Sequence, residues 1–303
     1  MGGGLMQLVA YGAQDIYLTG NPQITFFKVV YRRHTNFAME AIAQTFEGTP
    51  KDNSKVSATI ARNGDLVHRV YLELTGADAE GAVASTLVDE VELEIGGQLI
   101  DRHCGKWMDI WVELTHDSAK KAQHVALSNE AGCQWLPLQF SFCRNPGLAI
   151  PLIALQYHEV KLNIRFATVG DANVCLYCDY IYLDTDERRR FAQTSHEYLI
   201  EQVQTSKSNV IAKGCVTKVP LHFNHPVKEL VWDFVDGTVD GCDDTALLRL
   251  NGHERFSKRV MKYFSRVQLY QHHSGAGRDD SLCTYSFALQ PEEHQPSGTC
   301  NFS

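Results

Sequence analysis

The sequence predicts an all-β protein made of two tandem eight-stranded antiparallel jelly rolls, the second of them incomplete at its C-terminus. Three observations support this fold class. Short runs that alternate apolar and polar residues recur along the chain between Gly, Pro, Asn and Asp turns. One strand-and-turn phrase is repeated about 155 residues downstream, and its neighbours repeat with it. Convincing helical periodicity is confined to residues 107–127.

The repeat consists of three elements in the same order. Two alternating runs match, each ending in a Gly-Gly or Asn-Gly turn, and a strand precedes each run by about twenty residues. A third phrase follows before a Pro- and Gly-containing turn in both copies. The matching pairs are 65–74 with 226–234, 91–101 with 246–256, and 140–143 with 285–288. Two copies are too few for a solenoid, so each copy is expected to be a domain with its own core.

The repeat also predicts the domain bounds. Residues 1–24 form an N-terminal arm, 25–187 the first roll, 188–199 a linker and 200–303 the second roll. The first copy closes with two alternating strands at 160–166 and 174–183. The second copy reaches Ser303 where the equivalent strands should begin, so we expect the sequence to stop inside its second domain.

Two further segments complete the predicted elements. The periodic stretch 107–127 lies between two strands of the first copy and is expected to be a long helical excursion. A short helical turn is predicted at 186–192, because acidic residues open it and basic residues close it. Since Arg188 to Arg190 follow acidic residues, we interpret this basic run as a neutralised surface turn.

Composition excludes several classes of protein. The net charge is −8, without a clustered basic face, which argues against direct contact with nucleic acid. No run approaches the roughly 18 apolar residues of a membrane span. The N-terminus lacks the pattern of a secretory signal, and Met6 stands where a myristoylation signal requires Ser or Thr. The nine cysteines are scattered, which favours reduced thiols over a disulfide framework.

The sequence offers no chemistry for an enzyme. His222 and His225 form an HxxH pattern and Cys175 and Cys178 a CxxC pattern, but residues three apart on a strand point to opposite faces and cannot grip one metal ion. The adjacent pair His272 and His273 adds no ligand spacing. Nucleophile-elbow, P-loop and dinucleotide motifs are absent. We therefore expect no catalytic, cofactor-binding or metal-binding residue.

The aromatic residues of the alternating strands are expected to fill the sandwich cores. Any that are exposed are candidate anchors of a subunit interface. The residues concerned include Tyr177, Tyr180, Tyr182, Trp232 and Phe234. The sequon at Asn301 is given little weight, because such tripeptides arise often by chance.

Several long segments resemble a known family, the major capsid proteins of nucleocytoplasmic large double-stranded DNA viruses, and the similarity is greatest to those of algal viruses. Most of the similarity lies in the run Leu5 to Phe37, which reads LMQLVAYGAQDIYLTGNPQITFFKVVYRRHTNF. It extends over the whole chain through 92–101, 146–160, 191–201 and 295–303.

The resemblance implies a double jelly roll that forms a homotrimer, whose pseudo-hexagonal capsomer tiles an icosahedral shell. It implies contacts with neighbouring capsomers, minor capsid proteins and a penton protein, and a shell above an internal membrane that the chain does not span. The implied location is the virion, after assembly in the host cytoplasm. Residues 2–21, which are Gly-rich at their start and lie outside the repeat, are expected to act as an arm at the capsomer base, with a frayed terminus as the alternative. The alternatives are a carbohydrate-binding or receptor-attachment β-sandwich, and a cupin-like metal enzyme, which would need a His-x-His motif that is absent.

Overall fold

The computed structural model describes residues 21, 27–29, 34–76, 84–128, 132–211, 214–234, 244–275 and 280–302. The chain divides into Met1–Asn36 and one compact unit, Phe37–Ser303. Apart from Asn21, the predicted N-terminal arm at residues 1–24 lies outside the described residues, and so does its proposed role. No helix of the described part has the length and apolar character needed to cross a bilayer.

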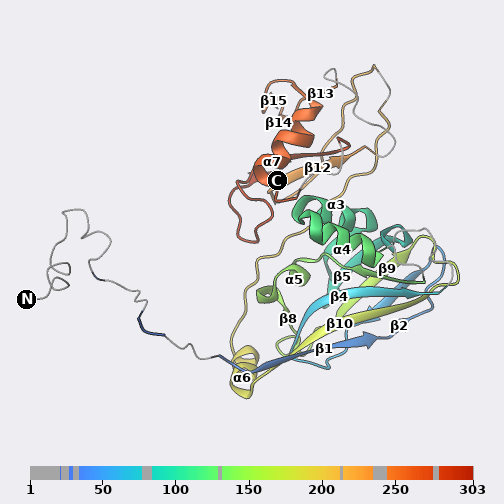
Figure 1. Ribbon diagram of the computed structural model, residues 1–303, viewed down its shortest axis with the longest axis vertical. Coiled ribbons are helices and arrows are strands. Elements are labelled where there is room, and N and C mark those ends of the chain that lie inside the picture. Colours follow the sequence, from blue (N-terminus) through green and yellow to red (C-terminus); the bar gives the residue numbers. More distant parts are fainter. Residues whose placement is uncertain are drawn as a thin grey trace, which may run out of the picture. The chain divides into compact units, whose positions relative to one another are not determined.

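The described elements follow one another as short strands with a few helices between them (Figure 1). In chain order they are β1 (Phe37–Gln44), β2 (Phe46–Glu47), β3 (Lys55–Thr59), β4 (Leu66–Thr75), η2 (Ala84–Leu87), β5 (Val88–Ile95), β6 (Gln98–Cys104), α3 (Gly105–Thr115), α4 (Ser118–Ser128), β7 (Cys133–Pro137), α5 (Ser141–Arg144), η3 (Pro146–Leu148), β8 (Ile150–Pro151), β9 (Val160–Phe166), β10 (Asn173–Leu183), α6 (Thr185–Gln193), β11 (Pro226–Val227), β12 (Glu229–Asp233), β13 (Thr245–Ala246), β14 (Arg249–Leu250), β15 (His253–Glu254), β16 (Arg259–Val260), the π-helical turn η4 (Tyr263–Val267), α7 (Gln268–His272), β17 (Leu282–Ser286) and β18 (Cys300–Asn301).

The first roll is a sandwich of two antiparallel sheets. Sheet A has the strand order β1-β10-β4-β7, with β8 paired to β4, and sheet B has the order β2-β3-β9-β5-β6. Strands that neighbour each other in a sheet are mostly distant in sequence, and the chain passes repeatedly from one sheet to the other. This is the double-Greek-key connection of a jelly roll, with eight principal strands. The predicted strands at 65–74, 160–166 and 174–183 are confirmed as β4, β9 and β10.

Alternation of side chains explains how the two sheets enclose one core. Along β9, Val160, Leu162, Ile164 and Phe166 are buried and the residues between them are not. Successive side chains of a strand point to opposite faces, so this pattern turns one face of each sheet inward. The buried residues of both sheets form one continuous hydrophobic cluster, with Leu72, Leu136 and Leu162 among its fully enclosed members.

The two predicted helical segments are confirmed with slightly wider bounds. The stretch predicted at 107–127 forms α3 and α4, which lie between β6 and β7. The turn predicted at 186–192 forms α6, where the Asp184 side chain accepts a hydrogen bond from the backbone N–H of Thr185. Acidic residues in the first turn of a helix and a basic residue in its last turn favour the helix dipole.

The second roll repeats the pairing of the first in a reduced form. The strand β12 pairs with β17, as β4 pairs with β7, and β14 pairs with β15, as β5 pairs with β6. The helical pair η4 and α7 precedes β17, as α3 and α4 precede β7. The two hairpin turns also agree: φ is 59° and 81° at Gly96 and Gly97, and 52° and 81° at Asn251 and Gly252. Two consecutive residues with positive φ form the tight hairpin turn for which Asn-Gly and Gly-Gly are favoured.

The third predicted match does not hold in the structure. Residues 141–144 form the short helix α5, whereas Tyr285 and Ser286 end the strand β17. The difference arises from packing, because Phe140 and Phe142 stack at 5.8 Å and both are buried in the first core. The repeat in this segment is therefore one of sequence and not of local structure. The boundary placed at 188–199 stays a prediction.

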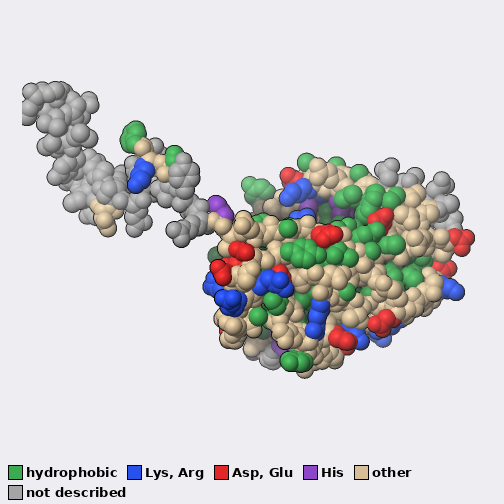
Figure 2. All heavy atoms as spheres, turned by 90° about the horizontal axis from the view of Figure 1, so that it is seen from below, with side chains coloured by type: hydrophobic (Ala, Val, Ile, Leu, Met, Phe, Trp, Pro, Cys, Tyr) green, Lys and Arg blue, Asp and Glu red, His purple; other side chains and the backbone are tan. Residues whose placement is uncertain are grey.

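The surface of the folded unit is not uniformly polar. Hydrophobic side chains gather in the middle of the face seen in Figure 2, with carboxylates among them and basic side chains mainly toward the rim. On β1, the edge strand of sheet A, Phe37 is 67% exposed and Met39 50% exposed. Contiguous apolar patches larger than a few hundred Å² are typical of interaction surfaces, whereas single exposed apolar side chains are ordinary.

Candidate functional site: the junction between the two rolls

The helix α3 joins the two rolls because apolar side chains emerge from two of its sides. Met108 is fully buried in the core of the first roll. Ile110 and Leu114, one turn apart, belong instead to a separate cluster with Leu269 of α7 and Leu282 of β17. Leu114 has no exposed surface. A helix that is apolar on both sides must be covered on both, so the second roll completes the burial of α3.

The second roll also caps the C-terminal end of α3. The backbone N–H of Gly275 donates to the Leu114 carbonyl oxygen at 2.8 Å. The Ser274 hydroxyl lies 3.1 Å from the Thr115 carbonyl oxygen and shares its one hydrogen between this oxygen and Glu292. These carbonyls are among the last four of the helix, which have no partner within it. A Cβ atom on Gly275 would lie 2.4 Å from the carbonyl oxygens of Glu113 and Leu114, so the close approach requires glycine.

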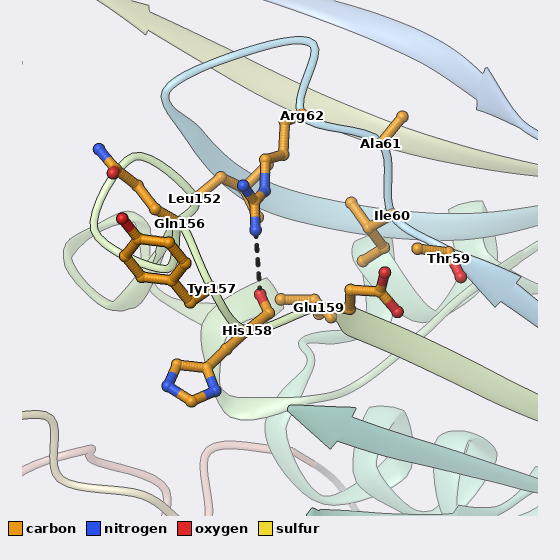
Figure 3. Close-up of a pocket in the computed structure, with 10 residues that line it drawn as sticks. Thr59, Ile60, Ala61, Arg62, Leu152, Gln156, Tyr157, His158 and Glu159 are labelled. Carbon is orange, nitrogen blue, oxygen red and sulfur yellow. Dashed lines mark hydrogen bonds between the residues drawn. The ribbon is translucent and has the colours of Figure 1, made fainter. Parts of the chain in front are cut away.

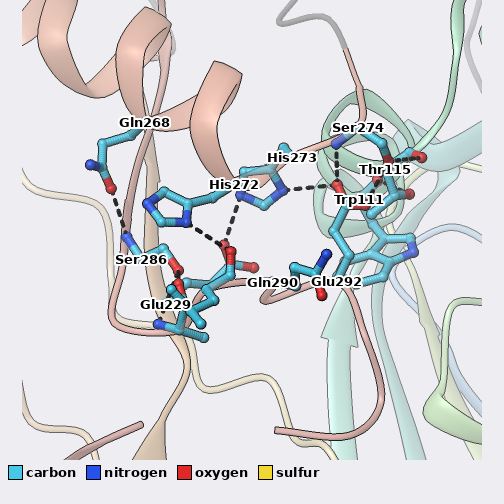
Figure 4. A network of polar contacts seen from close by, with 12 residues as sticks. Trp111, Thr115, Glu229, Gln268, His272, His273, Ser274, Ser286, Gln290 and Glu292 are labelled. Atoms are coloured by element: carbon cyan, nitrogen blue, oxygen red, sulfur yellow. Dashed lines mark hydrogen bonds and ion pairs between the residues drawn. The ribbon is translucent and has the colours of Figure 1, made fainter. Parts of the chain in front are cut away.

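A buried charge cluster holds the capping segment in place (Figure 4). The imidazole of His273 has no exposed surface and lies between two carboxylates, with Nε2 2.9 Å from Glu229 Oε2 and Nδ1 3.1 Å from Glu292 Oε1. Glu292 also accepts hydrogen bonds from the Ser274 backbone N–H at 2.8 Å and from the Ser274 hydroxyl at 2.6 Å. The cluster therefore fixes the residue that caps α3.

The protonation of this cluster follows from its geometry. Burial alone lowers the pKa of His273, but the ion pairs with Glu229 and Glu292 outweigh burial and raise that pKa to about 9. Burial acts to raise the pKa of Glu292, yet hydrogen bonds from His273 and Ser274 dominate and lower it. His273 is thus an imidazolium at neutral pH. A buried cation needs paired carboxylates, and removal of one member leaves an uncompensated charge.

A second polar cluster joins the segment after α6 to both rolls. Arg144 of α5 contacts Glu201 at 3.2 Å, and its guanidinium lies 4.1 Å from the centre of the Trp111 ring on α3. Lys228 of the second roll reaches the same Glu201 carboxylate and donates to the Glu293 carbonyl oxygen at 2.6 Å. One carboxylate therefore bridges a cation of each roll.

Two further contacts span the same interface. The Lys106 ammonium on the first turn of α3 lies 2.6 Å from the Asp233 carboxylate at the end of β12. The backbone N–H of Val203 donates to Asp101 Oδ1 at 3.0 Å. The junction thus combines an apolar cluster, a helix cap and charge pairs on several elements. Such a set restricts the angle between the rolls far more than a single contact does, because each contact has its own direction.

The sequence presents His273 only as a candidate metal ligand and does not reveal its role at the junction. Its partners Glu229 and Glu292 come from two other segments, so no local spacing signals the cluster. The His-Ser-Gly order after a helix is a helix-stop pattern, which is the one local signal for the cap. The other histidines that were considered, His222 and His225, lie before β11, and neither is buried.

The two cysteines of the CxxC pattern, Cys175 and Cys178, are part of a strand and not of a metal site. Cys175 is half-buried and Cys178 is buried on β10, in keeping with the opposite faces that the alternation requires. Burial strongly raises the pKa of the Cys178 thiol. Within the described ranges, no group of three or more His, Cys, Asp or Glu side chains is placed to hold a metal ion.

The aromatic residues divide between core and surface. Tyr180 is fully buried, as expected. The expectation of a core position is wrong for Tyr177, which lies half-buried on the outer face of sheet A and stacks on Tyr71 with ring centres 5.4 Å apart. Trp232 and Phe234 are partly buried against the small core of the second roll.

A hollow of about 400 Å³ lies between the loops 59–62 and 152–160 (Figure 3). Its charged groups are engaged in the fold: the Arg62 guanidinium donates to the Leu155 carbonyl oxygen at 2.7 Å, and Glu159 pairs with Lys161 at 3.1 Å. Tyr157 at its rim is 93% exposed. The hollow is therefore braced by structural contacts and presents no converging set of charged groups to a ligand.

Comparison with known proteins places this geometry in a family. A family model described as "Major capsid protein N-terminus" matches residues 25–184. A second model, described as "Large eukaryotic DNA virus major capsid protein", matches residues 187–247 and 238–303. Together the two models cover residues 25–303 except 185 and 186.

Individual relatives agree with the family models. The chain is 52% identical to the major capsid protein of Pyramimonas orientalis virus over 360 aligned positions, which cover 100% of this chain and 90% of the relative. It is 41% identical to the major capsid protein of Paramecium bursaria Chlorella virus 1, covering 100% of this chain and 85% of the relative. A chain of the solved "PBCV-1 virus capsid, quasi-atomic model" superposes with a TM-score of 0.82 at 37% identity, covering 92% of this chain and 84% of that one. With its two joined jelly rolls, the chain belongs to the family of structural major capsid proteins of large eukaryotic DNA viruses, and its role is to form the capsid, not to catalyse a reaction.

Proposed function

We propose that this chain forms a homotrimer whose six rolls make a pseudo-hexagonal capsomer, and that these capsomers tile an icosahedral shell. The observation that carries the proposal is the junction at α3, where Leu114 and Gly275 join the rolls through an apolar cluster and a helix cap. Two similar rolls held at one angle act as two adjacent sides of a hexagon, so three chains supply six sides. Closed cyclic assembly of this kind is the usual form of homo-oligomers.

The finer features of the proposal concern the surroundings of the capsomer. The shell is proposed to lie above an internal membrane, with minor capsid proteins beneath it and a penton protein at the vertices. The net charge of −8 supports a protein that makes no direct contact with the genome. Assembly is proposed to take place in the host cytoplasm. A carbohydrate-binding or receptor-attachment module is the alternative, and the family assignment does not favour it.

The oligomeric state tests the central proposal. Native mass spectrometry of the full chain should give a species of three times the 34.0 kDa monomer, and negative-stain imaging should show particles of hexagonal outline. A chain that stays monomeric at micromolar concentration and low salt, and that binds glycans as a free module, would contradict the proposal and favour the alternative.

A pair of glycine variants tests whether the junction carries the function. Gly275→Ala introduces a Cβ into the carbonyls of α3 and should disturb the angle between the rolls. Gly147→Ala is the matched control, because its Cβ would meet only the Asn145 side-chain oxygen at 3.3 Å. We expect hexagonal particles from the control and few from Gly275→Ala. Equal yields of hexagonal particles from the two variants would show that assembly does not depend on the junction.

A further inference from the structure

The outer face of sheet A carries a row of aromatic and apolar side chains in register across β1, β10, β4 and β7. Tyr177 of β10 pairs with Ala43 of β1 on one side and with Tyr71 of β4 on the other, and Tyr71 pairs with Pro137 of β7. The two tyrosine rings stack with their planes 10° apart. Side chains directly opposite on neighbouring strands share a face, so this row forms one strip across the sheet.

The neighbouring positions enlarge the strip and add negative charge. Trp135 and Glu73 pair across β7 and β4, and Asp179 of β10 pairs with Ala41 of β1. Neither Glu73 nor Asp179 makes an ion pair with any residue of the described ranges. Glu73 lies two residues from Tyr71 on β4, and Asp179 lies two residues along β10 from Tyr177, the partner of Tyr71. Burial and then the charges of Asp179 and Glu73 raise the pKa of the Tyr71 hydroxyl. The strip is thus apolar in the middle and carries two carboxylates that form no ion pair with a described residue, while the exposed Arg69 lies two residues from Tyr71 on the same face of β4.

The outer face of sheet B has a different composition, because its charged side chains pair with one another. Lys55 pairs with Glu92 at 2.7 Å, and Arg102 bonds to Glu90 at 2.9 Å and to Glu92 at 2.7 Å. Its charges are matched within the sheet. Aromatic residues are enriched and charged residues depleted in the cores of protein interfaces relative to the rest of the surface. Of the two outer faces, sheet A has the interface composition.

We infer that the outer face of sheet A binds the second roll of a neighbouring copy of this chain, through a basic ridge at residues 255–262. This inference rests on the proposed trimer and names the surface that closes it. The ridge contains Arg255, Lys258 and Arg259, all exposed. Arg259 lies over the Tyr263 ring at 4.3 Å, whereas Arg255 and Lys258 make no ion pair with a described residue.

Charge complementarity selects this occupant. Residues 25–187 contain fourteen Lys and Arg against twenty-two Asp and Glu, whereas residues 200–303 contain eleven against twelve. The acidic excess of the chain therefore belongs to the first roll, and contact between two first rolls would place like charges together. In a ring of three copies, each first roll meets the second roll of the next copy, a heterologous contact that closes by rotation. Opposite charges across such a contact set its register and suppress wrong pairings.

A charge-swap series tests the inference. The acidic-face variant is Glu73→Lys with Asp179→Lys, the ridge variant is Arg255→Glu with Lys258→Glu, and the swap variant combines all four changes. Asp89→Lys is the control on the other sheet: Asp89 of β5 is 58% exposed at its side chain, and its 3.8 Å pair with Arg165 is an exposed one of small energy. Sedimentation velocity over a dilution series at low salt measures the concentration at which trimers dissociate, and circular dichroism melting checks that each variant folds.

We expect the acidic-face and ridge variants each to raise the dissociation concentration at least about tenfold, which corresponds to about 1.4 kcal/mol. The swap variant should return to within about threefold of the unmodified chain, because the charge pairs are restored in the opposite sense. The Asp89→Lys control should assemble like the unmodified chain.

Three results would overturn the inference. They are an acidic-face variant that assembles normally, a swap variant that assembles no better than its two parents, or a control that dissociates as strongly as they do. If the unmodified chain is trimeric in these cases, the proposed capsomer stands, and only the assignment of the outer face of sheet A as its contact surface is wrong. If the unmodified chain itself never forms trimers, the proposed function fails and this inference fails with it.

Discussion

The backbone N–H of Gly275 donates to the carbonyl oxygen of Leu114 at 2.8 Å, so the second roll caps a helix that begins in the first. This contact ties the inter-roll angle to a backbone hydrogen bond, which tolerates little change in distance or direction. The contact also depends on the absence of a side chain at Gly275. The ion pair and hydrogen bonds of Glu292 with His273 and Ser274 fix the two residues before Gly275. The relative placement of the rolls is therefore decided by a few residues far apart in sequence.

A methyl group at position 275 should destabilise the protein. In Gly275→Ala the new Cβ would lie 2.4 Å from two backbone carbonyl oxygens, which cannot move without distorting α3. Overpacking of this kind costs about 1–3 kcal/mol. Urea denaturation of the monomeric form should show this loss, and Gly147→Ala should not. A Gly275→Ala chain as stable as the unmodified one would mean that the segment after α7 moves freely.

Truncation of Leu114 should weaken the junction by a different mechanism. Leu114 is fully enclosed by apolar neighbours from both rolls, so Leu114→Ala removes buried surface and leaves a cavity. The expected loss is about 2–5 kcal/mol in the free energy of unfolding. Val125→Ala, at a side chain on α4 that is 58% exposed, serves as the control and should change stability by less than about 0.5 kcal/mol. Equal losses in both variants would argue against a packed junction.

The stability of the junction should depend on pH through His273. Its pKa is raised from the ordinary 6.5 to about 9, so its contribution is complete below pH 6.5 and is lost as the pH rises through 9. Glu292 has a pKa lowered from 4.5, so its contribution is present above pH 4.5 and is lost as the pH falls below that. The contribution of His273 and Glu292 to the melting temperature should therefore be greatest between about pH 4.5 and 6.5.

The matched variants for the pH effect are His273→Gln and His222→Gln. His222 is exposed before β11, so its replacement should leave the alkaline decrease in melting temperature unchanged. His273→Gln should lower the melting temperature below pH 6.5 and flatten the decrease between pH 6.5 and 9. A His273→Gln chain that keeps the full alkaline decrease would assign the effect to other groups.

The ion pair between Lys106 and Asp233 should contribute little by itself. The two charged atoms are 2.6 Å apart, but the Lys106 side chain is 49% exposed. Pairs at such partly hydrated sites are worth about 0.2–1 kcal/mol. A double-mutant cycle of Lys106→Met and Asp233→Asn, followed by urea denaturation, measures the coupling. A coupling above about 2 kcal/mol would show that this pair acts as part of the buried cluster and not as a surface contact.

The strands of the first roll were predictable because each alternation is a local property. Along β9 the predicted and observed limits agree, since Val160 to Phe166 alternates without interruption. The third repeated phrase was not predictable in the same way. The segment 140–143 leads into a helix, because Phe140 and Phe142 are drawn into the core between the sheets. Tyr177 was misplaced for a related reason: an aromatic residue fits either face of a strand, and only the register with Tyr71 decides which.

The sequence by itself determined that the chain is β-structured, that one domain is duplicated, and that the repeated Gly96-Gly97 and Asn251-Gly252 turns form tight hairpins. These are local properties of alternation and of residues that accept positive φ. Only the tertiary structure decided how the rolls are joined, because His273, Glu229 and Glu292 meet from three separate segments. Only the strand register made one outer face aromatic and the other charged. Contacts between residues distant in sequence leave no periodic signal, so the two features that relate most directly to assembly emerge only when the chain is folded.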